Sequence, residues 1–218
     1  IQKCGAKAAN HKIKPEDRQP ALQTLVHEGS DEAAAYLLKR FTYIYDNNIV
    51  SDEEEKNYVY EGLVCFGDRV LPQLRLHLKS APTLSWGLRL LDEICDHETT
   101  WNVLAEVLEN YDPGYERDPS RKIQLMTFLG DFVDPRAAEA LIPYLQDHDE
   151  TVRFVTVEAL FKQNLEMARE PLLQACLDIK HLTRQFLPAS ELMVHSYGVQ
   201  IRHRRYWHPM LAPRIGQK

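Results

Sequence analysis

Two histidine–glutamate pairs, His27-Glu28 and His97-Glu98, are the residues of this sequence that come nearest to a metal site. Imidazole nitrogens and carboxylate oxygens bind zinc and iron, but a catalytic centre needs several such ligands that converge on one point. No third or fourth pair is present, and His27 falls at a predicted helix C-terminus, where its cationic form suits the helix dipole. We therefore expect no metal ion.

The four cysteines of the chain, Cys4, Cys65, Cys95 and Cys176, stand far apart. None belongs to a C-x-x-C pair or lies near a histidine cluster, so the spacings of zinc sites and redox motifs are absent. Cys65, Cys95 and Cys176 fall in apolar helical stripes, and unpaired cysteine is among the residues most often buried. We expect reduced thiols in the core and no disulfide framework.

Sequence signatures of catalysis are missing as well. There is no Gly-rich phosphate loop, no G-x-S-x-G elbow and no His-Glu-x-x-His helix. Ser, His and Asp occur, but in no pattern that implies a catalytic triad. The acidic runs 52–55 and 147–150 open predicted helices, where the helix dipole favours carboxylates, so we do not predict cation sites there. We expect neither catalytic residues nor a cofactor.

Charge is distributed unevenly along the 218 residues, whose formal net charge is −6. Residues 1–14 carry four lysines, residues 199–218 carry five basic residues, and neither segment has an acid. The body between them holds 17 basic and 32 acidic residues, and a negative field of this kind disfavours binding to nucleic-acid phosphates. A partner of the body is therefore expected to present a basic or amphipathic segment.

The composition, with 44% hydrophobic and 27% charged residues, is typical of a globular protein. No window approaches the roughly 18 to 20 consecutive apolar residues that a membrane span needs. The first 14 residues, IQKCGAKAANHKIK, lack the apolar core of a signal peptide. We expect a cytoplasmic protein that does not bind membranes.

Apolar residues repeat with a helical period almost throughout, and the alternation typical of strands is nearly absent. One example is the stripe of Val59, Gly62, Leu63 and Phe66. Short polar connections make neighbouring helices antiparallel. We predict an all-α chain of five helical hairpins and a closing helix, over residues 16–28 and 31–46, 52–66 and 68–80, 83–96 and 99–110, 119–132 and 135–147, 149–163 and 166–178, and 181–196.

Several residues mark where these helices should begin, end or bend. Each of three glycines follows the end of an apolar stripe, where a left-handed residue terminates a helix: Gly29, Gly67 and Gly130. Ser51 and Glu54 have the spacing of an N-terminal capping box. Second helices contain prolines, which kink or shorten a helix: Pro72, Pro143 and Pro171.

The second half of the chain repeats with a period of 31 residues, which places Leu129 on Leu160 and Leu141 on Leu172. A fixed period of this size indicates a solenoid. The sequence resembles the HEAT-like repeat of the armadillo superfamily at LGD (129–131), DPRA (134–137), LIPYL (141–145) and the D-x-x-V-R helix start at 149–153. The resemblance is clear over residues 119–178, looser over 51–110 and a matter of pattern alone over 16–46.

This resemblance implies a right-handed α-solenoid of about five hairpins in a domain of residues 15–198. A basic N-terminal segment, 1–14, and a basic aromatic tail, 199–218, flank that domain. Proteins with HEAT-like repeats mostly bind other proteins along their curved face. The resemblance therefore implies a non-enzymatic scaffold or adaptor with one or more protein partners.

Some proteins built from such repeats do chemistry or bind nucleic acid. Deoxyhypusine hydroxylase holds two irons with several His-Glu pairs, of which this chain has only two. HEAT-like DNA glycosylases line their concave face with Lys and Arg, whereas this body is acidic. Phycobilin lyases use similar repeats, and nothing in the sequence distinguishes a chromophore pocket from ordinary core. A HEAT-repeat enzyme and a nucleic-acid accessory protein remain alternatives.

Two segments outside the periodic pattern are candidate partner-binding sites. The connection 110–119 is long, rich in turn formers and carries Tyr111 and Tyr115; it is either a binding insertion or a solvated loop. The tail combines cations with aromatic rings, both enriched at binding hot spots, and it could equally cap the end of the array. Its candidate residues are Arg202, Arg204, Arg205, Tyr206 and Trp207.

Overall fold

Regular structure is helical throughout the part of the chain that the computed structural model describes, which is residues 1–45, 49–163 and 166–178. The all-α prediction is confirmed for this part. In chain order the elements, with 3₁₀ helices written η, are α1 (Gln2–Ala8), α2 (Pro15–Glu28), α3 (Asp31–Leu38), η1 (Lys39–Thr42), α4 (Ile49–Phe66), η2 (Gly67–Val70), α5 (Leu71–Ser80), α6 (Ser85–Ile94), α7 (His97–Leu108), α8 (Ser120–Asp131), α9 (Pro135–Leu141), η3 (Ile142–Gln146), α10 (Glu150–Gln163) and α11 (Glu166–Asp178).

The helices pack in two rows. In one row α2, α4, α6, α8 and α10 contact one another in succession; in the other, α1, α3, α5 and α7 do so, as do α9 and α11. Helices joined by a short connection, such as α2 with α3 and α8 with α9, also contact each other across the rows. Each helix thus buries its apolar stripe against several neighbours, and the core is one continuous cluster that runs from Ala8 to Leu172.

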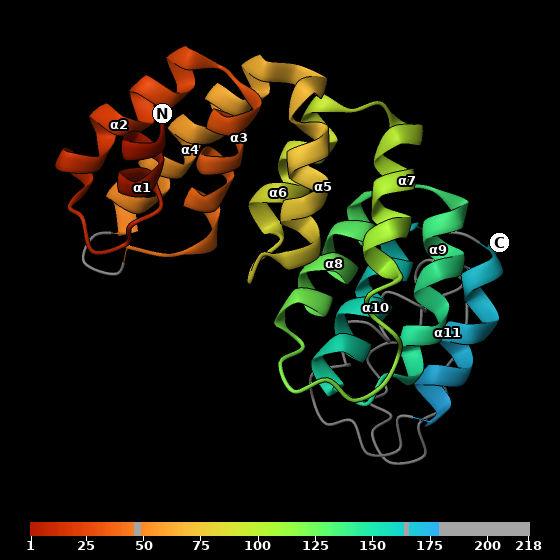
Figure 1. Cartoon of the computed structure of the whole chain (residues 1–218). Coiled ribbons are helices and arrows are strands. Elements are labelled where there is room, and N and C mark those ends of the chain that lie inside the picture. Colours follow the sequence, from red (N-terminus) through yellow and green to blue (C-terminus); the bar gives the residue numbers. More distant parts are fainter. Residues whose placement is uncertain (46–48, 164–165, 179–218) are drawn as a thin grey trace, which may run out of the picture.

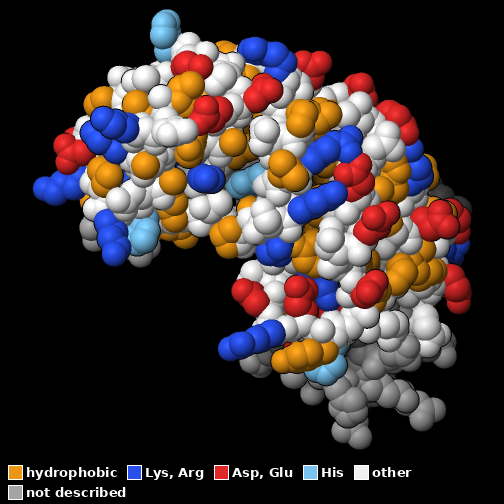
Figure 2. All heavy atoms as spheres, in the orientation of Figure 1, with side chains coloured by type: hydrophobic (Ala, Val, Ile, Leu, Met, Phe, Trp, Pro, Cys, Tyr) orange, Lys and Arg blue, Asp and Glu red, His pale blue; other side chains and the backbone are white. Residues whose placement is uncertain are grey.

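The described body has the shape of an arch (Figure 1). Helices α1 to α4 form one end, α5 and α6 lie in the middle, and α7 to α11 form the other end. The space-filling view shows a hollow on the lower side of the arch (Figure 2). The connections that follow α1, α5 and α7 lie on this hollowed side (Figure 1), so the loops between helices form much of the surface around the hollow.

Two of the three predicted helix-ending glycines do end helices. Gly29 has φ 66° and its N–H donates to the Leu25 carbonyl, and Gly67 has φ 64° directly after α4. The prediction for Gly130 is wrong, because Gly130 lies inside α8, where that helix approaches α10. A Cβ atom at this position would lie 2.7 Å from the Ala159 Cα atom. Here glycine permits close helix packing, which its position after an apolar stripe did not reveal.

Several predicted boundaries differ from the observed ones. The helix predicted over 31–46 ends as a 3₁₀ turn at Thr42. Pro72 and Pro143 lie in the first turn of α5 and η3, where a missing N–H costs nothing, so the predicted helices 68–80 and 135–147 are each divided in two. Pro171 does lie inside α11. The predicted capping box at Ser51 is also wrong, because α4 begins at Ile49 and Ser51 therefore lies inside the helix.

The structure also corrects two expectations about the first half of the chain. Residues 1–14, predicted only as a basic segment, contain α1, whose Gly5 and Ala8 are buried. Cys65 is exposed and not a core thiol, because it lies beside the buried stripe of α4 rather than on it. Cys4 and Cys95 are half-buried free thiols. The side chain of Cys176 and the predicted helix 181–196 lie outside the described residues.

Candidate partner-binding surface

One buried lysine holds the long connection between α7 and α8 in place. Lys122 in α8 donates from Nζ to the carbonyls of Asp112, at 3.0 Å, and Gly114, at 3.1 Å, and to Asp147 Oδ2 at 2.9 Å. The Gly114 N–H donates to the same carboxylate oxygen at 3.0 Å. Lys122 is 1% and Asp147 2% exposed. The connection is therefore tied both to α8 and to the turn before α10.

Asp147 stays ionised in this buried position because hydrogen bonds offset the cost of burial. Burial by itself raises the pKa of the Asp147 carboxyl, but the N–H groups of Asp149 and Gly114 and the ammonium of Lys122 lower it below its usual value. The pair is thus a true ion pair. The sequence motifs did not single out this pair, although Lys122 shares the helical spacing of Leu125, Met126 and Leu129 and so belongs to the buried stripe.

The two tyrosines of this connection lie in different environments. Tyr111 is 4% exposed, its carbonyl accepts a hydrogen bond from the Tyr144 hydroxyl, and the Arg121 guanidinium carbon lies 5.3 Å from its ring centroid. Its side chain is not on the surface, which removes it as a candidate contact. Tyr115 is 77% exposed and packs edge-on against His148 at 5.4 Å between ring centroids. Tyr115 therefore remains a candidate contact residue.

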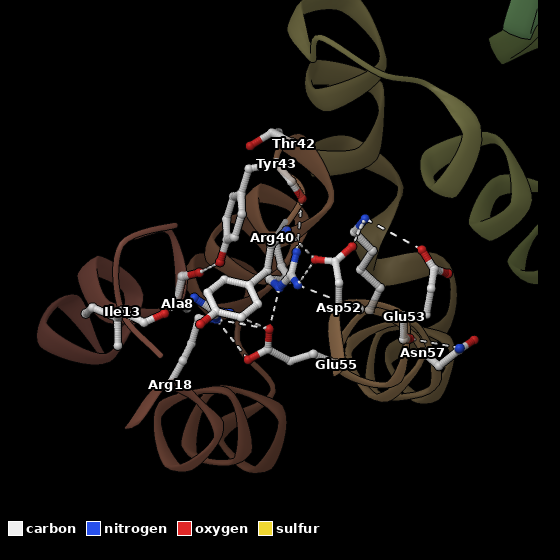
Figure 3. Close-up of polar contacts among 12 residues, drawn as sticks. Ala8, Ile13, Arg18, Arg40, Thr42, Tyr43, Asp52, Glu53, Glu55 and Asn57 are labelled. Carbon is white, nitrogen blue, oxygen red and sulfur yellow. Dashed lines mark hydrogen bonds and ion pairs between the residues drawn. The ribbon is translucent and has the colours of Figure 1, made fainter. Parts of the chain in front are cut away.

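A larger buried ion cluster lies at the other end of the arch, where α2, η1 and α4 meet (Figure 3). Arg18 Nε and Arg40 Nε each lie 2.8 Å from a Glu55 oxygen, and Arg40 also pairs with Asp52. Asp52 pairs in turn with Lys56. Both arginine side chains are fully buried, so every charge in the cluster depends on its partners for solvation.

This cluster fixes two neighbouring surface segments. Arg18 Nη1 donates to the carbonyls of Asn10, at 3.1 Å, and Ile13, at 2.7 Å, which holds the connection 9–14. Arg40 Nη1 donates to the Tyr43 carbonyl, at 3.1 Å, and the Tyr45 N–H donates to Asp52 Oδ1 at 2.9 Å. In addition, the Tyr43 hydroxyl donates to the Ala8 carbonyl at 2.6 Å. Burial raises the pKa of Tyr43 to about 12, so this hydroxyl stays protonated.

The cluster could have been found from the sequence by asking which charged residues share a buried stripe. Arg18 has the helical spacing of Ala21, Leu22 and Leu25, all buried in α2. A charged residue on such a face needs a buried partner of opposite charge. The pattern alone does not identify Glu55 as that partner, because it lies 37 positions away.

The pair His97-Glu98 is engaged in a structural contact between α7 and α9. His97 Nε2 lies 2.9 Å from Asp134 Oδ2, and Arg136 bonds both Asp134 and Glu98. Hydrogen bonds from Arg136 lower the pKa of the Asp134 carboxyl far below its usual value. Glu28 of the other pair accepts a hydrogen bond from the Ser30 N–H. Among the described residues, no three His, Cys, Asp or Glu side chains gather as a metal site would require.

One buried histidine has a ring nitrogen with no hydrogen-bond partner. His77, near the end of α5, is 8% exposed; its ring lies beside Gly87 of α6, and its Nε2 has no hydrogen-bond partner. Burial, with a smaller contribution from the nearby Arg121 cation, lowers the pKa of His77 to about 4. His77 is therefore neutral at pH 7. No motif in the sequence marks this residue as buried and unpaired.

The remaining predicted contacts, Arg202, Arg204, Arg205, Tyr206 and Trp207, lie outside the described residues. Within the described part, no helix is both long enough and apolar enough to cross a membrane. Compared with known proteins, the sequence matches no protein-family model, and no curated protein matches it.

Proposed function

We propose that this chain is a non-enzymatic scaffold or adaptor that binds other proteins through ordered loops on the hollowed side of the arch. One observation carries the proposal. The buried Lys122–Asp147 pair and the buried Arg18–Arg40–Glu55 cluster both hold surface loops in place through hydrogen bonds to the loop backbone. A buried ion pair contributes little net stability, because desolvation offsets its Coulomb attraction, so we ascribe its role to fixing one geometry. A loop that is already ordered loses less conformational entropy when a partner binds.

We further propose that the two rows of helices form a right-handed α-solenoid of HEAT-like repeats, as in the armadillo superfamily. Three observations support this assignment: helices contact their neighbours within each row, short connections join the rows, and the 31-residue period relates α8 to α10 and α9 to α11. A solenoid suits a scaffold because each repeat contacts only its neighbours and leaves long surfaces open to partners.

The connection between α7 and α8, which spans residues 109–119 in the structure, provides the direct test of the binding function. The full-length chain and its Tyr115→Ser/Arg117→Ser variant are used to capture proteins from an extract of the native organism. Both residues are exposed on the ordered loop, and we expect the variant to lose specific proteins that the original chain retains. A Lys162→Ser/Arg169→Ser variant, altered at exposed or half-buried positions on α10 and α11, is the control and should retain them. Identical capture by all three proteins would contradict a role for this loop.

Other measurements separate the alternatives. Stoichiometric iron or zinc in the purified chain would favour a HEAT-repeat enzyme. Nucleic-acid binding that falls steeply with salt would favour an accessory factor that uses the basic ends. Deleting residues 199–218 distinguishes a binding tail, whose loss removes a partner and leaves the melting temperature unchanged, from a cap, whose loss lowers the melting temperature by several degrees.

A further inference from the structure

Exposed aliphatic side chains gather at the N-terminal end of the arch. Ile44 is 63%, Ile49 70% and Val50 67% exposed. The Tyr45 N–H bonds to Asp52, which brings the segment of Ile44 next to the first turns of α4. Large aliphatic side chains that are exposed in one region, and not scattered singly, are typical of a surface that a partner covers.

Basic side chains lie beside these aliphatic ones. His11, Lys12 and Lys14 are exposed on the connection 9–14, and the His11 ring lies 6.3 Å from that of Tyr43, the residue before Ile44. Figure 2 shows basic, histidine and hydrophobic side chains together on the lower side of the N-terminal end, next to the hollow. We name this surface, formed by His11, Lys12, Lys14, Ile44, Ile49 and Val50, the N-terminal platform.

Buried ion pairs and hydrogen bonds hold the loops of the platform in place. Arg18 bonds the carbonyls at both ends of the lysine-bearing loop, while Arg40 and Asp52 bond the segment that carries Ile44. Glu55 links the two arginines (Figure 3). Four charges from three helices thus fix the relative positions of the basic and the aliphatic parts.

From this arrangement we infer that the N-terminal platform binds an acidic amphipathic segment of a partner protein. Its aliphatic residues would contact an apolar stripe on the partner, and its cations would pair with carboxylates that flank this stripe. Lys12 and Lys14 belong to a segment, residues 1–14, that carries no acid, and their charges also orient an approaching acidic segment. An extended anionic membrane fits less well, because the acidic body would be repelled by it.

This inference rests on the proposed scaffold function, but it concerns the loops held by Arg18 and Arg40, whereas the capture experiment above alters only residues 115 and 117, so the two tests can fail separately. The probe is a fluorescent 14-residue helical peptide with leucine at i, i+3, i+4 and i+7 and glutamate at the exposed positions. Its anisotropy is measured with the full chain. We expect binding that weakens with salt, and at least about tenfold weaker binding for a matched peptide with lysine in place of glutamate.

Variants locate the binding site. Lys12→Glu/Lys14→Glu and Ile49→Ser/Val50→Ser should each weaken binding of the glutamate peptide about tenfold or more. The control Lys162→Glu/Arg169→Glu changes the net charge by the same amount at the other end of the arch and should bind nearly as well as the original chain. Circular dichroism and melting curves confirm that each variant is folded.

Three outcomes would overturn the inference. Equal weakening by the platform and control variants would show a net-charge effect. Platform-dependent binding to vesicles rich in phosphatidylserine, without peptide binding, would make the surface a membrane contact. A sedimentation mass that rises with concentration and is reduced by the platform variants, again without peptide binding, would make it an interface between two copies of this chain.

Discussion

At the scale of single residues, buried charges serve to hold loops. Lys122 and Arg18 are almost inaccessible to solvent, yet each bonds backbone carbonyls of a connection as well as a carboxylate. Carbonyl groups in a connection have no helical partner, so a buried cation supplies the hydrogen bonds that they lack. Such a side chain couples the stability of the core to the conformation of a loop.

Replacing Lys122 should therefore affect both the stability of the fold and the conformation of the connection between α7 and α8. In Lys122→Met, Asp147 remains buried without its cation, and we expect the free energy of unfolding to fall by about 3 to 5 kcal/mol. Trypsin cleavage after the exposed Arg117 should become faster, because the connection loses its anchor. The double variant Lys122→Met/Asp147→Leu should recover stability in urea unfolding but not resistance to trypsin. Unchanged cleavage rates would show that the ion pair does not order the connection.

His77 makes stability depend on pH. Its pKa of about 4 in the folded chain lies below the usual value of about 6.5, so the unfolded chain binds a proton first as the pH falls. This contribution is complete above pH ~6.5 and is lost between about pH 6.5 and 4. Urea unfolding of the original chain should show roughly 2 kcal/mol more loss between pH 7 and pH 5 than that of His77→Leu. Equal losses would mean that His77 titrates normally.

At the scale of helices, the approach of α8 to α10 depends on Gly130. A Cβ atom there would meet the backbone of Ala159, which cannot move aside as a flexible side chain can. The Gln163 side chain at the end of α10 further ties this pair together, because its Nε2 donates to the carbonyls of Leu129 and Phe132 and its Oε1 accepts from the Asp134 N–H. Close contact and a shared polar network thus join α8 to α10.

Gly130→Ala tests this contact. Alanine favours an isolated helix by about 1 kcal/mol over glycine, but here the methyl group should separate α8 from α10 and lower the free energy of unfolding by about 1 to 3 kcal/mol. Thr127→Ala, at an exposed position one turn before Gly130, is the matched control and should change it by less than about 0.5 kcal/mol. Chemical denaturation measures both, and a stabilised Gly130→Ala variant would refute the close approach.

In the molecule as a whole, the packing of helices in rows should confine the destabilisation caused by a substitution to the neighbouring helices. Helix α8 contacts α6, α9 and α10, while α2 to α4 contact one another and their immediate neighbours. Where helices contact mainly their neighbours, stability is approximately a sum of contributions from local units and their interfaces.

Native-state hydrogen exchange can show which helices a substitution destabilises. In Gly130→Ala, we expect faster exchange of amides in α8 to α10 and little change in α2 to α4, because α5 and α6 lie between the two regions (Figure 1). Mass spectrometry of peptic fragments resolves the helices. Uniformly faster exchange along the chain would instead indicate a single cooperative unit.

Most helices could be predicted from the sequence, because a helix buries a stripe whose 3.6-residue period is visible in the order of residues. The glycines at 29 and 67 end helices as predicted, since a left-handed residue is a local backbone property. Gly130 and Ser51 were wrongly predicted, because a glycine within a stripe can either end a helix or admit a neighbour, and because α4 begins two residues before the serine.

Which residues form the surface and which form the core between the helices depends on tertiary packing. Tyr111 and Tyr115 are four positions apart in one connection, yet one is buried and the other exposed, because Lys122 and Asp147 draw the backbone of the connection inward. The platform depends likewise on Arg18 reaching Glu55, 37 positions along the chain. Such pairings depend on how the helices pack in space. The local sequence around Arg18 does not show which distant residue will lie next to it.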